Sequence, residues 1–311
     1  MPETSITLPA FAKINWSLRI LGRRPDGYHE IDTVLQTISL RDTIQLMATE
    51  APEIHLSCDD RTLRVDARNL VYRAAVALQG SHAPGKGARI RLEKRTPSQA
   101  GLGGGSSDAA ATLIGLCHIW NIEASFAKLN EIAGNLGADV PFFLEGGTGR
   151  GTGIGTRVTP LADADRKFLL IIKPNASAST AQAYQTLNAP SLTTLSGDTI
   201  LSSSPSLESF DSDLVNDFEG NVLRREPEID RAKAALKKAG AQDAMLAGSG
   251  SAVFGIFDKR EAQERAIQAI KLEPGWRVFP CTTVGRDQYR RAMGPCSTTL
   301  ARLSEGMNAG A

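Results

Sequence analysis

Residues 97–111 read PSQAGLGGGSSDAAA, and this stretch decides how the rest of the chain is interpreted. It lies between a predicted strand over 88–95 and an apolar run over 109–120 that has helical spacing. Four glycines fall within five positions: Gly101, Gly103, Gly104 and Gly105. Because glycine tolerates positive φ and has no Cβ, such a loop can turn its backbone N–H groups inward onto an oxyanion. The pattern therefore predicts a phosphate-binding loop.

The start of the helix after the glycines favours the same ligand. Ser106, Ser107 and Asp108 are expected to form its cap and first turn, where free N–H groups and the positive dipole end attract an anion. A Walker A loop is excluded because no lysine follows the glycines, and a dinucleotide fingerprint because the sixth position from Gly101 is Ser106. The alternative is a flexible connection without a ligand, but such linkers are not usually joined to a capped, apolar helix.

Length and composition indicate an ordinary globular protein. The 311 residues leave room for two domains or one large one, and 35 Lys and Arg nearly balance 34 Asp and Glu, which does not favour nucleic acid as a partner. The N-terminus lacks the features of a signal peptide, and no apolar run approaches about 18 residues. Four cysteines without CxxC spacing argue for reduced thiols and against a zinc site: Cys58, Cys117, Cys281 and Cys296. A soluble cytoplasmic protein without a membrane partner is expected.

Residues 6–21 contain the first candidate functional pair. The segment alternates well enough to be a strand pair broken near Pro9. Within it, Lys13 and Asn15 are two positions apart, so a strand places both side chains on one face. The spacing alone leaves two interpretations open: a solvated lysine on the outside of a sheet, or a functional lysine beside an asparagine.

Two further segments of the N-terminal half carry polar side chains that are either functional or incidental. The Pro-Asp-Gly sequence over 25–27 forms a turn by its chemistry and places Tyr28 and His29 at the start of a strand. Asp139 directly precedes the short apolar segment 140–143, where a carboxylate is either a cap or a functional group.

The C-terminal half is expected to form a second domain from about residue 160. Thr180 is expected to cap a helix that carries Tyr184 one turn in, where a half-buried core residue is the ordinary alternative. The serine-rich segment 191–213 predicts a mobile surface insertion, and 248–251 form a second glycine loop. The remaining expected elements are helices over 69–79, 124–136 and 261–271, strands over 167–174 and 276–284, and a hairpin over 146–155.

The stretch PSQAGLGGGSSDAA resembles the phosphate loop of the GHMP kinases, the small-molecule kinases named for galactose, homoserine, mevalonate and phosphomevalonate. The resemblance covers roughly residues 6–284. Further matching segments follow in the expected order: AKINWSLRILGRRPDGYHEIDTVLQ over 12–36, LGADVPFF over 136–143, NDFE over 216–219 and GSGS over 248–251. Trp16 departs from the smaller apolar residue that is more common in the family, which we interpret as a variation in packing.

The resemblance implies an α+β protein with the two-domain GHMP kinase fold, in which nucleotide and substrate bind in the inter-domain cleft. It divides the chain into an N-terminal ATP-binding domain over 1–160, a C-terminal domain over 161–285 and a flexible tail over 286–311. It also implies an ATP- and Mg²⁺-dependent kinase that acts on a small-molecule alcohol, as a monomer or weak homodimer.

The same resemblance assigns roles to individual residues. Lys13 and Asp139 match the catalytic lysine and aspartate. The expected ATP-binding residues are Pro97, Gly101, Leu102, Gly103, Gly104, Gly105, Ser106, Ser107 and Asp108. The expected substrate-binding residues are Asn15, Tyr28, His29, Thr180 and Tyr184. Metal ligands remain unassigned, with the hydroxyl of Ser106 or Ser107 as candidates.

Within the family, the sequence is most similar to a member whose substrate carries a cytosine, because Tyr28 and Tyr184 match tyrosines that stack on the two faces of the base. A GHMP kinase for mevalonate or homoserine would not need these aromatic residues. A noncatalytic nucleotide- or RNA-binding protein would need neither Lys13 nor Asp139, and RNA binding would favour a basic surface.

Overall fold

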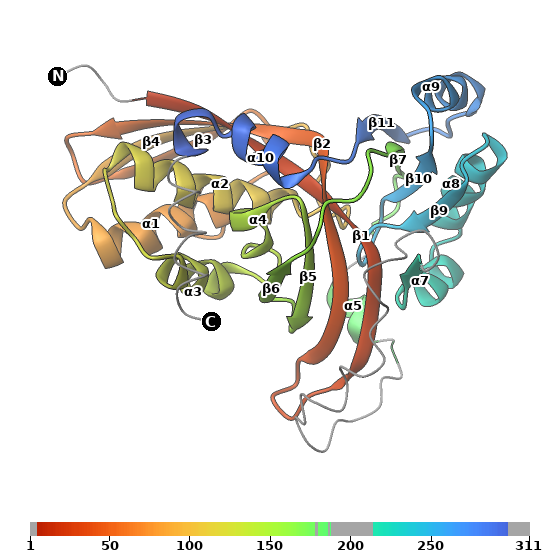
Figure 1. Cartoon of the computed structure of the whole chain (residues 1–311), viewed down its shortest axis with the longest axis horizontal. Helices are drawn as coiled ribbons and strands as arrows, with labels where there is room; N and C mark the ends of the chain where they lie inside the picture. Colours follow the sequence, from red (N-terminus) through yellow and green to blue (C-terminus); the bar gives the residue numbers. More distant parts are fainter. Residues whose placement is uncertain (1–4, 178–179, 186, 188–213, 298–311) are drawn as a thin grey trace.

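Two long strands, β1 (Ser5–Arg23) and β2 (His29–Thr49), lie side by side, and the first sheet is built around them (Figure 1). They pair antiparallel, and the Pro-Asp-Gly turn that joins them has Gly27 at a φ of 88°, as its chemistry predicted. The computed structural model describes residues 5–177, 180–185, 187 and 214–297.

The first sheet is built around this pair. It has seven strands, ordered β3-β4-β2-β1-β8, with β5 also pairing with β2 and β6 pairing with β5. The added strands are β3 (Ile54–Cys58), β4 (Gly87–Glu93), β5 (Thr148–Gly153), β6 (Arg157–Pro160) and β8 (Val215–Asn216). Because β8 joins the edge of β1 from the second half of the chain, both halves contribute to this sheet.

Helices of the N-terminal half pack on the first sheet and on one another (Figure 1). They are α1 (Leu70–His82), α2 (Gly104–Ile119), α3 (Phe126–Leu136) and α4 (Phe142–Glu145). The side chain of Asn69 accepts a hydrogen bond from the Val71 N–H at 2.9 Å and caps α1, as the sequence predicted. α2 is buried on nearly all sides because it lies between the sheet and α1.

The second sheet has four strands in the order β11-β7-β10-β9. These are β7 (Phe168–Lys173), β9 (Asp243–Leu246), β10 (Val253–Phe257) and β11 (Arg277–Thr282). Among the described residues, the helices that accompany this sheet are α5 (Thr180–Gln185), α7 (Glu219–Arg225), α8 (Pro227–Lys238) and α9 (Arg260–Ala269). Along β7, Leu170 and Ile172 pack into a core with α8, whereas Leu169 and Ile171 pack against β1 residues such as Ile14. The alternation of β7 therefore joins the two halves.

The structure corrects two expectations. The segment 6–21 is not broken at Pro9, because β1 runs through it as one strand with Pro9 opposite Thr43. Proline is tolerated there because β8 pairs with β1 only at Ser17 and Leu18, so the other edge of β1 has no strand partner near Pro9 in the described residues.

The second correction concerns the expected flexible tail. Residues 286–297 are ordered: they form α10 (Arg286–Ala292) and a 3₁₀ turn (Gly294–Cys296). Tyr289, Met293 and Cys296 recur at helical spacing and are buried in the N-terminal core, which holds the segment in place. Residues 298–311 and the serine-rich segment 191–213 lie outside the described residues. The boundaries at residues 160 and 285 stay predictions.

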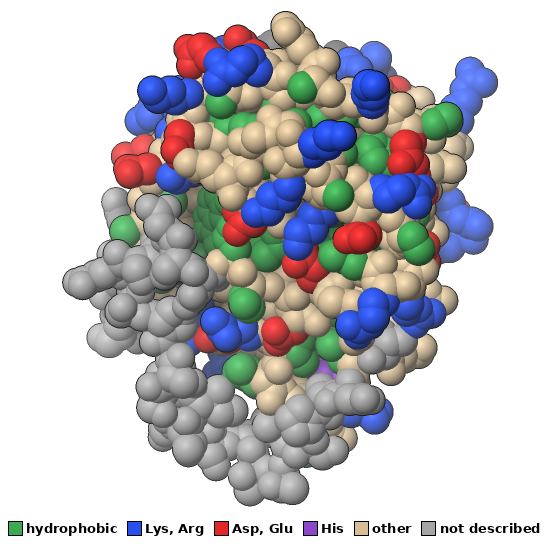
Figure 2. All heavy atoms as spheres, turned by 90° about the vertical axis from the view of Figure 1, so that its right-hand side faces the viewer, with side chains coloured by type: hydrophobic (Ala, Val, Ile, Leu, Met, Phe, Trp, Pro, Cys, Tyr) green, Lys and Arg blue, Asp and Glu red, His purple; other side chains and the backbone are tan. Residues whose placement is uncertain are grey.

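The outer face of the C-terminal half carries charges of both signs (Figure 2). Lys and Arg side chains alternate there with Asp and Glu rather than gathering into one patch. Three ion pairs of α8 residues illustrate the mixture: Arg231 with Glu273, Lys233 with Glu219, and Lys237 with Asp243. In the described part of the chain, every helix is too short or too polar to cross a bilayer.

Candidate active site

A cavity of about 710 Å³ opens where β1, the start of α2 and the second glycine loop meet. Its lining brings together residues expected at the site from distant parts of the chain: Lys13, Asn15, Pro97, Gly101, Leu102, Gly103, Gly104, Gly105, Ser106, Asp108, Asp139 and Tyr184. Other lining residues were not expected at the site: Thr33, Arg64, Arg68, Asn69, Lys94 and Thr96. Of the described residues expected there, Ser107, Tyr28 and His29 do not line it.

The start of α2 differs from the predicted cap. Gly103 is the N-cap residue at a φ of 68°, and no side chain caps the helix with a hydrogen bond. The predicted cap is therefore wrong, because glycine's access to positive φ lets the helix begin earlier, whereas Ser106 and Ser107 do lie in the first turn. The uncapped first turn leaves backbone N–H groups available to an anion. The side chain of Ser107 is buried instead, away from the cavity.

The second glycine loop holds the phosphate loop in place. The Ala252 N–H donates to the Ala100 carbonyl at 3.1 Å, and the Lys13 N–H donates to the Leu102 carbonyl at 2.9 Å. A Cβ on Gly101 would lie 1.8 Å from the Ala247 carbonyl oxygen, so only glycine permits this approach. The phosphate loop is thus fixed between β1 and the loop that precedes β10.

Lys13 extends from β1 into the cavity and is almost fully buried. Its ammonium donates to Asn15 Oδ1 at 2.8 Å and forms an ion pair with Asp139 Oδ2 at 3.4 Å. The predicted common face of Lys13 and Asn15 is confirmed. Asp139 lies in the turn after α3, and 37% of its side chain is exposed, so its carboxylate faces both the lysine and the open cavity.

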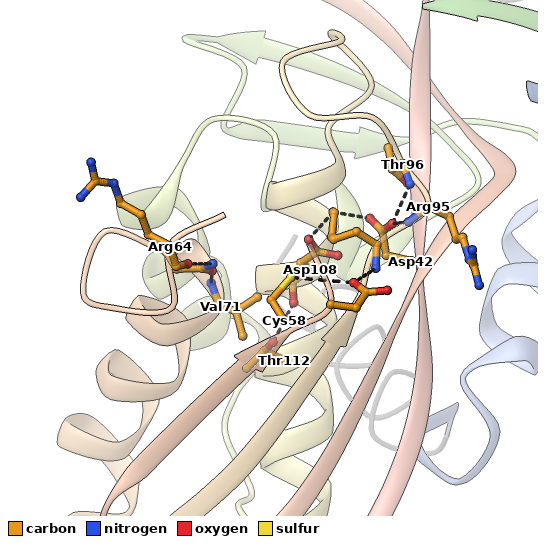
Figure 3. Close-up of polar contacts among 11 residues, drawn as sticks. Asp42, Cys58, Arg64, Val71, Arg95, Thr96, Asp108 and Thr112 are labelled. Atoms are coloured by element: carbon orange, nitrogen blue, oxygen red, sulfur yellow. Dashed lines mark hydrogen bonds and ion pairs between the residues drawn. The ribbon is translucent and has the colours of Figure 1, made fainter. Parts of the chain in front are cut away.

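A second lysine at the cavity was not foreseen. Lys94 follows β4, and its ammonium lies 2.5 Å from Asp42 and 2.7 Å from Asp108 (Figure 3). The other oxygen of Asp42 accepts the N–H groups of Arg95 and Thr96. Burial lowers the pKa of Lys94, but the two carboxylates raise it more, so the ammonium keeps its charge. Asp108 thus lines the cavity beneath the loop, and one of its oxygens accepts a hydrogen bond from the Lys94 ammonium.

The sequence offers a single sign of this cluster, which is a charged residue on an otherwise apolar face of a strand. Asp42 shares one face of β2 with Leu40 and Ile44 and is fully buried, but its neighbours Arg41 and Thr43 are polar, so the local pattern does not distinguish it from a solvent-exposed charge. At the same end of the cavity, Arg64 and Arg68 lie on the rim, and the Arg64 side chain points away from the cluster in Figure 3.

At the other end of the cavity, aromatic rings gather around Tyr184 of α5. Its ring stacks on His29 with centroids 4.8 Å apart and meets Phe218 edge-on, also at 4.8 Å. Burial raises the pKa of Tyr184 to about 12 and lowers that of His29, so both side chains are neutral near pH 7. Tyr28 is 61% exposed and is not one of the rings that contact Tyr184 in the described residues. α5 begins at Thr180, whose side chain lies outside the described part of the structure.

Comparisons with known proteins agree with this fold. A family model for the "GHMP kinases N terminal domain" matches residues 69–147, and one for "GHMP kinases C terminal" matches residues 204–274. A homoserine kinase from Cytophaga hutchinsonii shares the fold, with a TM-score of 0.65 at 21% identity over 93% of this chain and 97% of that one. The fold and the loop define a GHMP kinase, as the sequence resemblance implied.

Relatives of higher sequence identity narrow the class. The 4-diphosphocytidyl-2-C-methyl-D-erythritol kinase of Solibacter usitatus is 41% identical over 290 residues, which cover 91% of this chain and 90% of that protein. The kinase of the same name from Salinibacter ruber is 41% identical over 271 residues, 84% of this chain and 93% of that protein. A crystal structure of 4-(cytidine 5'-diphospho)-2C-methyl-D-erythritol kinase has a TM-score of 0.74 at 32% identity, covering 90% of this chain and 100% of that one. The chain belongs to the 4-diphosphocytidyl-2-C-methyl-D-erythritol kinase family.

Proposed function

We propose that this chain transfers the γ-phosphoryl group of ATP to the 2-hydroxyl of 4-diphosphocytidyl-2-C-methyl-D-erythritol, giving the 2-phosphate and ADP. This step belongs to isopentenyl diphosphate biosynthesis by the non-mevalonate (methylerythritol phosphate) pathway. The observation that carries the proposal is the Lys13–Asp139 pair, 3.4 Å apart, at the cavity that the phosphate loop lines. A cytoplasmic enzyme that is a monomer or weak homodimer is part of the same proposal.

Phosphoryl transfer requires more than the phosphate loop. A helix N-terminus stabilises an exposed anion by about 0.3–1 kcal/mol, whereas enzymes lower reaction barriers by about 8 kcal/mol or more. Lys13 adds a buried positive charge where negative charge develops on the transferred group. Asp139 orients the attacking hydroxyl and accepts its proton, as that oxygen bonds to phosphorus and the bond from phosphorus to the ADP oxygen breaks.

The residues at the cavity fit a magnesium ion bound together with ATP. Mg²⁺ in such sites takes one or two carboxylates, substrate phosphates and several waters rather than a full set of protein ligands. Asp139 and the hydroxyl of Ser106 line the cavity and would hold it. When bound, the ion would neutralise phosphate charge and help to orient the γ-phosphate.

The position of the Lys13–Asp139 pair also indicates which end of the cavity each substrate would occupy. The γ-phosphate must lie near this pair, so the adenine would extend toward the start of α1, where Asn69, Leu70 and Lys94 line the cavity. The acceptor would then approach from the opposite end, with its cytosine against Tyr184 and with His29, Thr180 and Asn15 nearby. Tyr28 is free to cover the base, and stacking contributes about 1–3 kcal/mol for each aromatic contact.

Release of ADP from ATP and Mg²⁺ tests the proposal, measured with the diphosphocytidyl alcohol, mevalonate and homoserine as acceptors. We expect turnover with the first acceptor alone and a fall of roughly 10²-fold or more in Asp139→Asn, the typical effect of losing a general base. Asp230→Asn, an exposed position on α8, is the control and should retain activity. Turnover of mevalonate instead would refute the cytosine assignment, and full activity of Asp139→Asn would remove that residue from the chemistry.

A further inference from the structure

A chain of buried hydrogen bonds extends from the catalytic lysine into the first sheet. Asn15 accepts from the Lys13 ammonium at 2.8 Å and donates through Nδ2 to the Thr33 hydroxyl at 2.8 Å. The Thr33 hydroxyl in turn donates to the carbonyl of Ser17 at 2.7 Å. Lys13, Asn15 and Thr33 are each at most 3% exposed, so the lining leaves little water to replace a lost partner.

The two ends of this chain fix the direction of every bond in it. The Ser17 carbonyl can only accept, so it takes the single proton of the Thr33 hydroxyl, and that hydroxyl can then only accept from Asn15. At the other end, the lysine ammonium can only donate. The Asn15 amide therefore has one orientation, with Nδ2 toward Thr33 and Oδ1 toward Lys13.

An irregularity in the strand pairing brings these groups together. Asn15 pairs with Leu35 and Ser17 pairs with Val34, so Trp16 is an extra residue of β1. Such a bulge interrupts the regular ladder and redirects side chains next to it. Here the Thr33 hydroxyl satisfies the carbonyl that follows the bulge.

We propose that Thr33 is a positioning residue for phosphoryl transfer: by fixing the Asn15 amide, it holds the Lys13 ammonium against Asp139 and the cavity. The inference rests on the proposed function for the role of Lys13. One ammonium proton is directed to Asn15 and Asp139 lies within ion-pair distance, which leaves a donor for a phosphate oxygen. Without Thr33, the amide can rotate and present Nδ2 to the lysine, which turns an attraction into a repulsion between donors.

The test substitutes Thr33 by valine, which keeps the shape and removes the hydroxyl, and by serine, which keeps the hydroxyl. We expect Thr33→Val to lower kcat about 10-fold while both KM values stay within about 2-fold, and Thr33→Ser to restore most of the rate. Thr37→Val is the matched control, because the buried Thr37 hydroxyl on the same strand has no hydrogen-bond partner in the described residues. If Thr33→Val does not fold, Thr33→Ala takes its place.

A double-mutant cycle separates positioning from a general structural effect. If Thr33 acts through Asn15, adding Thr33→Val to Asn15→Ala changes kcat by less than about 2-fold. Additive losses, or losses in the Thr33→Ser or Thr37→Val protein as large as the loss in Thr33→Val, would overturn the proposal.

A crystal structure of Thr33→Val gives a readout that does not depend on the substrate. We expect the contact between Lys13 Nζ and Asn15 Oδ1 to be lost, and an unchanged contact would contradict the proposal. If the wild-type protein does not phosphorylate the diphosphocytidyl alcohol, the proposed function fails, whereas this structure still decides the role of Thr33.

Discussion

Asp108 lies beneath the phosphate loop, and its pKa lies far above the ordinary value of an aspartate. Burial raises its pKa to about 8, against the opposing effect of Lys94, and the nearby carboxylate of Asp42 raises it further. Its Oδ1 atom has no hydrogen-bond partner among the described residues. The folded protein therefore favours the protonated form of Asp108.

This shift makes the stability of the folded protein depend on pH. Because the folded-state pKa lies above the ordinary value of 3.8, the stabilisation is complete below about pH 4 and is lost as the pH rises through about 8. Asp108→Asn imitates the protonated form. We expect this variant to unfold at a slightly higher temperature than the wild type near about pH 5, and the difference to grow to several degrees near about pH 9.

Asp42→Asn provides the contrast. Both carboxylates share Lys94, but the second oxygen of Asp42 accepts the N–H groups of Arg95 and Thr96. In this variant the remaining oxygen still accepts these two N–H groups, so the amide nitrogen faces the lysine ammonium. Two donors then face each other at every pH, and we expect a lower unfolding temperature at both pH values. Equal losses for Asp108→Asn at both values would refute the assigned ionisation.

Some site residues could be predicted from sequence and others could not, for a physical reason. Lys13 and Asn15 share a face through strand periodicity, and the family resemblance added Asp139, which strand spacing alone cannot join to them. The roles of Asp42 and Thr33 depend on partners that meet only in the fold: Asp42 binds a lysine 52 positions away, and Thr33 an asparagine 18 positions away. No local pattern encodes such pairs.

At the scale of elements, the two glycine loops act as one unit. Gly101 has a φ of 77°, and a Cβ there would overlap the Ala247 carbonyl of the neighbouring loop. We expect Gly101→Ala to separate the loops, to lower kcat/KM for ATP by about 10²-fold and to reduce the unfolding temperature. Steady-state kinetics and thermal unfolding measure both effects.

Gly80→Ala is the control for this substitution. Gly80 lies in α1, where an added Cβ meets nothing within 4 Å, so alanine should stabilise the helix by about 0.5–1 kcal/mol without affecting ATP. Retention of full ATP efficiency in Gly101→Ala would show that the contact between the loops has no role in nucleotide binding.

Most helices and strands were predicted from the sequence, but the start of α2 and the C-terminal segment 286–297 were predicted wrongly. The helices and strands with clear periodicity, such as α3 and β7, were predicted close to their observed bounds. The start of α2 was misplaced because the serines suggested a side-chain cap. The helix instead begins after Gly103, which is the N-cap residue at a positive φ and makes no side-chain hydrogen bond. Residues 286–297 were misread because their apolar side chains are few and pack against the other half of the chain.

At the scale of the whole molecule, the chain crosses between its halves several times. β8 returns to the first sheet, and after β11 the chain returns again to place α10 on the N-terminal core. Gln36 links these passages: its amide donates to the Gly147 carbonyl and to the Val284 carbonyl just before α10. The C-terminal segment thus fastens the second sheet to the first.

We therefore expect the protein to lose stability when the contacts of α10 with the N-terminal core are removed. Tyr289 is 1% exposed, packs on Phe11 with ring centroids 5.5 Å apart, and donates its hydroxyl to the Phe143 carbonyl. We expect Tyr289→Ala to lower the free energy of unfolding in urea by about 3–5 kcal/mol through the cavity it leaves, and Tyr289→Phe by about 1 kcal/mol through the lost hydrogen bond. A chain ending at residue 285 should lose more than one ending at 297, because only the former lacks α10. Equal stability of these two chains would mean that α10 rests on the core without holding the halves together.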